Sequence, residues 1–164
     1  MYKAIDVANY VIKKSIDIGS PVSNLKLQKI LYYIQAAMLV EMGERCFDDK
    51  ITAWEFGPVV VSVYQIYKEY GRGDIPIQKV QKKMVFDANQ MKIITKDNIV
   101  TINSKYKKII DKVIQAYSTV KNPFELVRKT HQEKPWKDTN INDEIDWKAI
   151  QQYYLKNPEK IYSW

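Results

Sequence analysis

The chain has 164 residues, of which 46% are hydrophobic and 12% aromatic, and its net charge is +7. This length and composition are typical of one folded domain that needs no metal or disulfide for stability, and they exclude a disordered chain. With Cys46 as the single cysteine, an internal disulfide and a thiolate zinc site are excluded, and we expect a soluble protein in a reducing cytoplasm. The opening residues include Lys3 and Asp6, so we expect no signal peptide.

The positive charge is concentrated in the middle of the chain. Residues 1–67 balance to zero, residues 68–137 hold sixteen basic and seven acidic residues, and residues 138–164 carry a charge of −2. Such a surplus can attract nucleic acid or an acidic protein face. The simpler interpretation is a lysine-rich surface that keeps the protein soluble. Only three of the 26 basic residues are arginines, the residue on which readers of DNA bases rely.

Apolar residues spaced three and four apart predict the first helices. One covers about residues 3–18 and a second covers about residues 24–42. Ser23 or Asn24 can cap the second helix, which is long and apolar enough to be central. A third helix is expected from Pro58 to Tyr70, because a proline in the first turn of a helix loses no hydrogen bond.

The basic middle segment contains a predicted β-hairpin. Residues 91–95 and 98–103 are rich in Ile, Val and Thr, and Lys96-Asp97 would form the turn between these two strands. Further helices are predicted over residues 104–117, 122–132 and 146–156, with Ser104 and Asp146 as caps of the first and the last. The predicted fold is mainly α: a single compact helical domain with a small β-hairpin insertion.

Motifs of the common catalytic sites are absent from the sequence. A glycine-rich phosphate loop, a nucleophile elbow and an HExxH helix do not occur, and one histidine excludes a histidine-based metal cluster. His131 and Cys46 could form a nucleophile–base pair, but nothing in their spacing supports it. Asp48, Asp49 and Glu55 leave a hydrolase as an alternative, although such acids are usually surface groups. We therefore expect a protein that is not an enzyme and that holds no cofactor or metal.

The segment AWEFGPVV, at residues 53–60, combines two aromatic residues with a Gly-Pro pair. Gly57 allows a sharp change of direction, and Pro58 presets the backbone for the start of a helix. Trp54 and Phe56 would flank this junction with buried area. We expect Trp54 in the core; the alternative is an exposed contact residue.

A second aromatic junction is predicted near the only histidine. Lys134-Pro135 stops the preceding helix, so the indole of Trp136 can fold back against it. His131 can then bond a backbone carbonyl. We favour this structural role for His131 over a catalytic one.

Three segments taken together resemble a known family. They are LKLQKILYY with Gln35 at residues 25–35, AWEFGPVV leading to Val63-Tyr64, and Thr130-His131 leading to Pro135-Trp136. In this order and spacing they are similar to the SocA-like antitoxin domain. That domain is also called the Panacea domain and occurs in bacterial toxin–antitoxin operons and phage-associated proteins. One departure is Val61, where the family often has a second proline.

The resemblance implies a non-catalytic antitoxin that neutralises a cognate protein toxin by direct binding. It covers most of a single domain, residues 1–164, with a variable hairpin region at 74–102 and a C-terminal helix and tail at 143–164. The signature positions that the resemblance marks, mainly structural in role, are Leu27, Lys29, Tyr32, Tyr33, Gln35, Trp54, Gly57, Pro58, Tyr64, His131, Pro135 and Trp136.

The contact surface for a partner is expected on the basic segment. The lysines that we assign to this surface are Lys79, Lys82, Lys83, Lys105, Lys107 and Lys108. The alternative to a toxin is nucleic acid, bound by a regulator of phage or operon origin, and such binding would weaken steeply with salt. A helix-turn-helix with a basic recognition helix is not visible in the sequence, so the protein partner ranks first.

Overall fold

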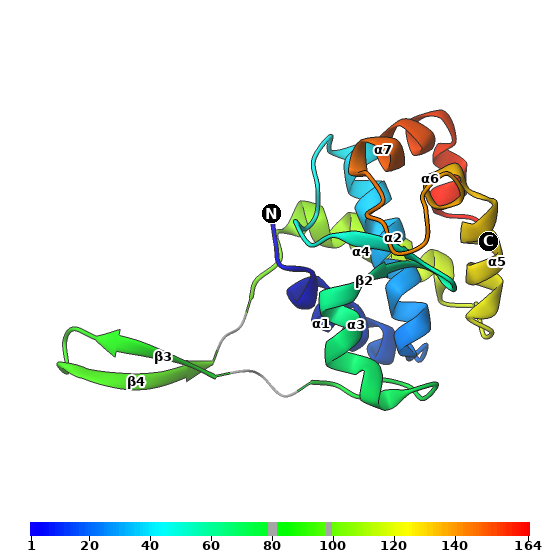
Figure 1. Ribbon diagram of the computed structural model, residues 1–164. Coiled ribbons are helices and arrows are strands. Elements are labelled where there is room, and N and C mark those ends of the chain that lie inside the picture. The colour runs from blue at the N-terminus through cyan, green and yellow to red at the C-terminus, as the bar shows by residue number, and fades with distance from the viewer. Residues whose placement is uncertain (79–81, 98–99) are drawn as a thin grey trace.

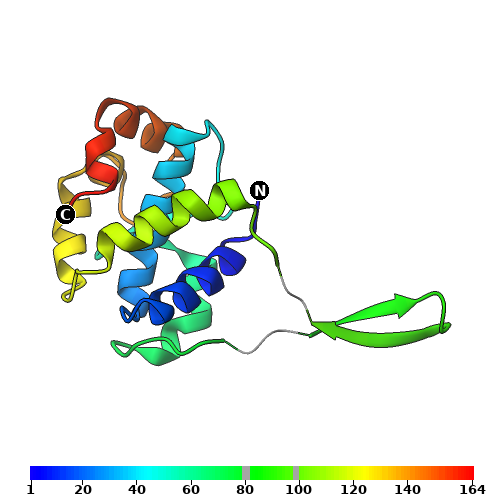
Figure 2. The same cartoon turned by 180° about the vertical axis from the view of Figure 1, so that it is seen from behind.

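The computed structural model describes residues 1–78, 82–97 and 100–164 (Figure 1). Helices pack around one central helix, and a two-stranded hairpin extends away from this helical body (Figures 1 and 2). The prediction of a mainly α fold with a small hairpin is therefore confirmed. Every helix in the described part of the chain is too short or too polar to cross a membrane.

The central helix is α2, Asn24–Glu41. It is buried around nearly its whole circumference, and polar Lys26, Gln28 and Lys29 are buried along with its apolar residues. The Ser23 hydroxyl accepts a hydrogen bond from the backbone N–H of Lys26, so Ser23 rather than Asn24 caps the helix. The helices that pack on α2 come from distant parts of the chain: α1 (Ala4–Asp17), α4 (Ser104–Tyr117) and α7 (Trp147–Lys156).

A short antiparallel hairpin follows α2. Strand β1, Ile51–Trp54, pairs with β2, Gly57–Val60, so that Ala53 lies opposite Pro58. On its other edge β1 exchanges backbone hydrogen bonds with residues 142–145. This small sheet therefore joins the middle of the chain to the segment that leads into α7.

The prediction that Pro58 starts a helix is wrong. Helix α3 is Val61–Tyr67 and continues as a 3-10 turn, Lys68–Tyr70. The backbone N–H and C=O of Ala53 bond residues 142–143 instead of Pro58, so the missing N–H of Pro58 costs the β1–β2 ladder no hydrogen bond. A Gly-Pro pair fits such a strand as well as it fits a helix start.

The second hairpin has a different register from the predicted one. Strand β3, Lys82–Asp87, pairs with β4, Lys92–Asp97, and residues 88–91 form the turn. The Asp87 carboxylate accepts hydrogen bonds from two backbone N–H groups of this turn, which fixes the turn here and not at Lys96-Asp97. Residues 91–95 fall at the end of the turn and in the second strand. Residues 98–99 of the other predicted strand lie outside the described residues, and residues 100–103 form no strand.

The remaining helices lie close to their predicted positions. The side chain of Asn103, not that of Ser104, caps α4 by accepting a hydrogen bond from the backbone of Lys105 at 2.9 Å. The carboxylate of Asp146 caps α7 as predicted. Two further helices and a final 3-10 turn complete the body: α5 (Phe124–Gln132), α6 (Lys134–Lys137) and Pro158–Ile161.

Candidate functional site

Several of the signature residues meet where β2 passes between α2 and α5. The Lys29 side chain is fully buried, and its Nζ donates a hydrogen bond to the carbonyl oxygen of Pro58 at 3.0 Å. Gly57, with φ of 99°, lies against Lys29 and Thr130, and a Cβ at this position would be 2.7 Å from Thr130 Oγ1. Only glycine permits this approach of β2 to the two helices. We call Lys29, Gly57, Pro58, Thr130 and His131 the Lys29 junction.

Burial changes the protonation of the Lys29 amine. Removal from water disfavours the charged form and lowers the pKa of Lys29 to about 7. The amine therefore loses its proton at a lower pH than a surface lysine does. A hydrogen bond to the Pro58 carbonyl partly offsets the cost of burying this polar group.

His131 and the aromatic residues extend the Lys29 junction toward the surface. The rings of His131 and Trp136 are stacked, with centroids 3.8 Å apart and an angle of 12° between their planes. The indole Nε1 of Trp136 donates to the backbone carbonyl of Trp54 at 3.0 Å, which ties α6 to β1. Burial lowers the pKa of His131, the charge of Lys29 lowers it further, and a hydrogen bond with the Glu55 backbone opposes both effects.

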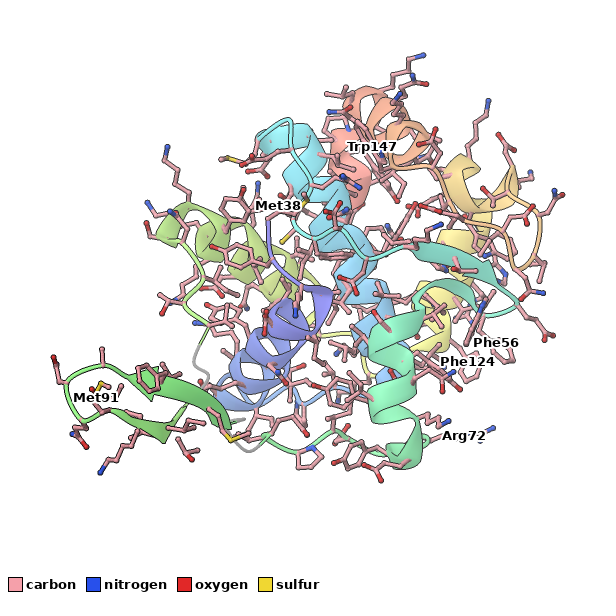
Figure 3. All side chains as sticks on the ribbon, turned by 60° about the vertical axis from the view of Figure 1, so that its left-hand side comes forward. Met38, Phe56, Arg72, Met91, Phe124 and Trp147 are labelled. Carbon is pink, nitrogen blue, oxygen red and sulfur yellow. The ribbon has the colours of Figure 1, made fainter. Side chains whose placement is uncertain are left out.

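Trp54 and Phe56 are less buried than the sequence predicts. The Trp54 side chain is half-buried and packs edge-on against Tyr64, with ring centroids 4.9 Å apart. Phe56 is 51% exposed and meets Phe124 of α5 edge-on at the surface (Figure 3). The tight turn between β1 and β2 points Phe56 outward, so the expectation that it buries area at the junction is wrong.

A buried carboxylate binds α2 one helical turn beyond Lys29, at Tyr33. One Oε atom of Glu133 accepts hydrogen bonds from the hydroxyls of Tyr33 at 2.9 Å and Tyr154 at 2.6 Å. The other pairs with Lys129 Nζ at 2.9 Å, and the same ammonium lies 3.7 Å from the centroid of the Tyr33 ring. Tyr32 packs edge-on against Tyr33, with ring centroids 5.2 Å apart. We call this set the Glu133 network; it connects α2, α5 and α7.

Gln35 anchors the loop between α2 and β1. Its Oε1 accepts hydrogen bonds from the backbone N–H groups of Cys46 and Phe47, and its Nε2 donates to the Phe47 carbonyl. Burial raises the pKa of the Cys46 thiol to about 12, which disfavours the thiolate that a nucleophile would need. Leu27 lies in the core, as does Pro135 at the start of α6.

The acidic residues that suggested a hydrolase have structural contacts. Asp49 accepts hydrogen bonds from the backbone N–H of Ala4, at the start of α1, and from the Ser62 hydroxyl. Asp48 pairs with Arg45 at 2.6 Å. Glu55 lies exposed in the turn between β1 and β2. Asp48 and Asp49 thus bind different partners within the fold, and the side chain of Glu55 lies in solvent.

An open groove of about 760 Å³ lies between α6 and α7, and sequence reasoning did not find it. Most of the residues that line it have polar side chains, and they include Asp138, Asp143, Glu144 and Asp146. Within the described ranges, no cluster of three or more histidine, cysteine or acidic residues could hold a metal ion.

The lysines assigned to a partner surface occupy two places. Lys105, Lys107 and Lys108 lie on the first turns of α4; Lys105 and Lys108 are exposed, and Lys107 lies 5.7 Å from the Tyr10 ring. Lys82 and Lys83 lie on β3, with side chains outside the described part, and Lys79 falls wholly outside it. The hairpin leaves the body on the same side as the start of α4 (Figures 1 and 2).

Comparison with known proteins identifies the family of this chain. A family model described as "Antitoxin SocA-like, Panacea domain" matches residues 27–137, about two thirds of the chain. The chain belongs to this SocA-like family. A curated relative, Antitoxin SocA of Caulobacter vibrioides (strain NA1000 / CB15N), is 34% identical over 79 residues, which is 48% of this chain and 42% of the relative. The match thus spans less than half of the relative. No solved structure matches the chain.

Most residues of the Lys29 junction and of the Glu133 network lie in the region matched by the Panacea family model. The Lys29 junction lies entirely within residues 27–137, whereas Tyr154 of the Glu133 network comes from α7, beyond that region. Sequence reasoning missed Glu133 and Lys129, whose only local signal is their spacing of four residues on a helix. Nothing in that spacing indicates that Glu133 is buried.

Proposed function

We propose that the chain is an antitoxin that binds a cognate protein toxin directly in the cytoplasm and keeps it inactive. The match of residues 27–137 to the SocA-like antitoxin model carries this proposal, and the curated antitoxin relative supports it. In this proposal the Lys29 junction and the Glu133 network hold the helices in fixed positions, and the surface they support makes the contacts. Catalysis has no part in it.

Co-expression with the product of the adjacent gene tests the proposal. We expect that product to arrest growth when it is expressed alone, and we expect the arrest to be lifted when the full chain is co-expressed. The two proteins should co-purify as a complex. A neighbour that is harmless alone and does not bind the chain would contradict the proposal.

The exposed lysines of α4 form a proposed part of the contact surface. Reversal of charge in Lys105→Glu/Lys108→Glu should slow association with an acidic toxin face and reduce its dependence on salt. Lys13→Glu, an exposed lysine on α1, is the matched control and should leave association unchanged. Equal effects of the two variants on the association rate would remove this surface from the proposal.

A further inference from the structure

The projecting hairpin carries the three most exposed large apolar side chains in the described part of the chain, those of Met84, Met91 and Ile93. Met84, Phe86, Met91 and Ile93 are between 60% and 80% exposed. Phe86 lies directly opposite Ile93, so their side chains share one face of the hairpin. Met91 lies at the turn, at the far end from the helical body (Figure 3). We call these four residues the apolar hairpin surface.

An isolated hairpin of this kind has little stability in water. A two-stranded hairpin is marginally stable without a third strand or a helix packed on it. Here β3 and β4 extend away from the helices, and both outer edges of the pair leave backbone groups open to new partners (Figures 1 and 2). Clustered exposed apolar side chains usually mark an interaction site. A surface that covers this hairpin would supply the packing that the body does not.

The charge of the hairpin indicates what covers it. Strands β3 and β4 contain four lysines and two aspartates, and the exposed lysines of α4 follow in the chain. A second copy would bring like charges together at each hairpin, so self-association is disfavoured. A nucleic acid would satisfy the lysines, but it offers no apolar groove for Met84, Phe86 and Ile93. Exposed apolar side chains on a segment of positive net charge fit an apolar protein groove bordered by carboxylates.

We infer that the apolar hairpin surface inserts into an apolar groove, bordered by acidic side chains, on the partner protein. This inference rests on the proposed function, because the partner is the toxin neutralised by the chain. Phe86 and Ile93 are the anchors of the contact, since they form a facing pair at the middle of the exposed surface. The positive net charge of the hairpin sequence accelerates association with the acidic border of the groove.

The experiment compares binding of the adjacent gene's product to three forms of the full chain. They are the wild type, Phe86→Thr/Ile93→Thr, and the control Leu155→Gln. Threonine retains a high strand propensity, so the double variant removes the apolar anchors and preserves the hairpin. Leu155 is a similarly exposed apolar residue on α7, outside the hairpin. Calorimetric titration gives the dissociation constants, and thermal melts report on the fold of each form.

We expect the double variant to bind about 100-fold more weakly or worse, whereas the control binds like the wild type and all three forms melt together. A double variant that binds the product with the dissociation constant of the wild type would overturn the hairpin inference but not the proposed function. A wild type that does not bind the product would overturn the proposed function and the inference with it. A wild-type dimer that the double variant lacks, or duplex DNA bound through the hairpin, would assign the surface to another occupant.

Discussion

At the scale of single residues, Lys29 and Gly57 show how closely the chain is packed at its signature. The amine of Lys29 is buried against the Pro58 carbonyl, and Gly57 has space for no side chain because Thr130 and Lys29 occupy it. Both residues stand in segments that resemble the family. The sequence indicates that these segments belong together, but burial of a lysine could not be inferred from it, since lysine is almost always a surface residue.

Replacement of Gly57 by alanine should be strongly destabilising. The new Cβ would lie 2.7 Å from Thr130 Oγ1 and 2.8 Å from Lys29 Cε, at a φ that side chains rarely adopt. We expect the free energy of unfolding to fall by about 2–5 kcal/mol, measured by urea denaturation. Gly19→Ala is the matched control: its φ is also positive, but nothing lies within 4 Å, so it should cost about 1–2 kcal/mol. Equal losses in the two variants would contradict the close packing at Gly57.

Lys29 should make stability depend on pH. The unfolded chain protonates this amine below its ordinary pKa of 10.5, whereas burial lowers the pKa of Lys29 in the folded protein to about 7. Between these values the unfolded chain binds more protons, so the contribution of Lys29 to the free energy of unfolding rises with pH and is lost as pH falls toward 7. We expect this rise to be smaller in Lys29→Met between pH 7 and pH 9, below the range in which the unfolded Cys46 thiol, with an ordinary pKa of 9.0, is largely ionised.

The control for this experiment is Lys13→Met, at an exposed position on α1. It should retain the wild-type dependence on pH in urea denaturation at each pH. A dependence in Lys29→Met as steep as in the wild type would mean that the Lys29 amine titrates normally in the folded protein.

At the scale of helices and strands, hydrogen bonds determine the positions of strands and turns that the apolar pattern of the sequence does not predict. Periodicity predicts α1, α4, α5 and α7 because each buries a stripe of apolar residues, and it predicts α2 as well, although α2 is buried around nearly its whole circumference. It fails at Pro58, where pairing with β1 replaces the expected first turn of a helix. It fails again at the projecting hairpin, where the Asp87 side chain fixes the turn eight residues before the predicted one. Both outcomes depend on hydrogen bonds that apolar spacing does not encode.

Loss of the Glu133 carboxylate should loosen the attachment of α5 and α7 to α2. Glu133→Ala leaves Lys129 and two tyrosine hydroxyls without their buried partner. We expect the free energy of unfolding to fall by about 3–5 kcal/mol in urea denaturation. Glu144→Ala removes a carboxylate that also pairs with a lysine, Lys50, but at the surface, and it should change stability little. A Glu133 variant as stable as the Glu144 variant would show that the network does not hold the helices.

At the scale of the whole molecule, the chain divides into a helical body and the hairpin that projects from it. All core residues in the described ranges belong to the body, and they include Ile75 and Ile102 on either side of the hairpin. The family resemblance predicts a variable region at 74–102, but nothing in the sequence indicates that the hairpin projects. The alternation of residues predicts which face of a strand is apolar, but it does not show whether another part of the chain packs on that face.

Removal of the hairpin should leave the body folded. We expect a chain with residues 82–97 replaced by a Gly/Ser linker of equal length to melt within about 2 °C of the wild type, because the exchange removes no core contact and changes stability by less than about 1 kcal/mol. Differential scanning calorimetry of the two chains measures the difference. A much lower melting temperature would show that the hairpin belongs to the cooperative unit.

The position of α2 at the centre has a consequence for biosynthesis. Its residues leave the ribosome early, yet the hydroxyl of Tyr154 and the amide of Gln151, which contact Tyr32 and Leu39, are made more than a hundred residues later. At 5–20 residues per second this interval lasts on the order of 10 s. During that time the apolar side chains of residues 24–41 are exposed to solvent in the nascent chain. Molecular chaperones that bind emerging polypeptides should therefore stay in contact longest with this segment.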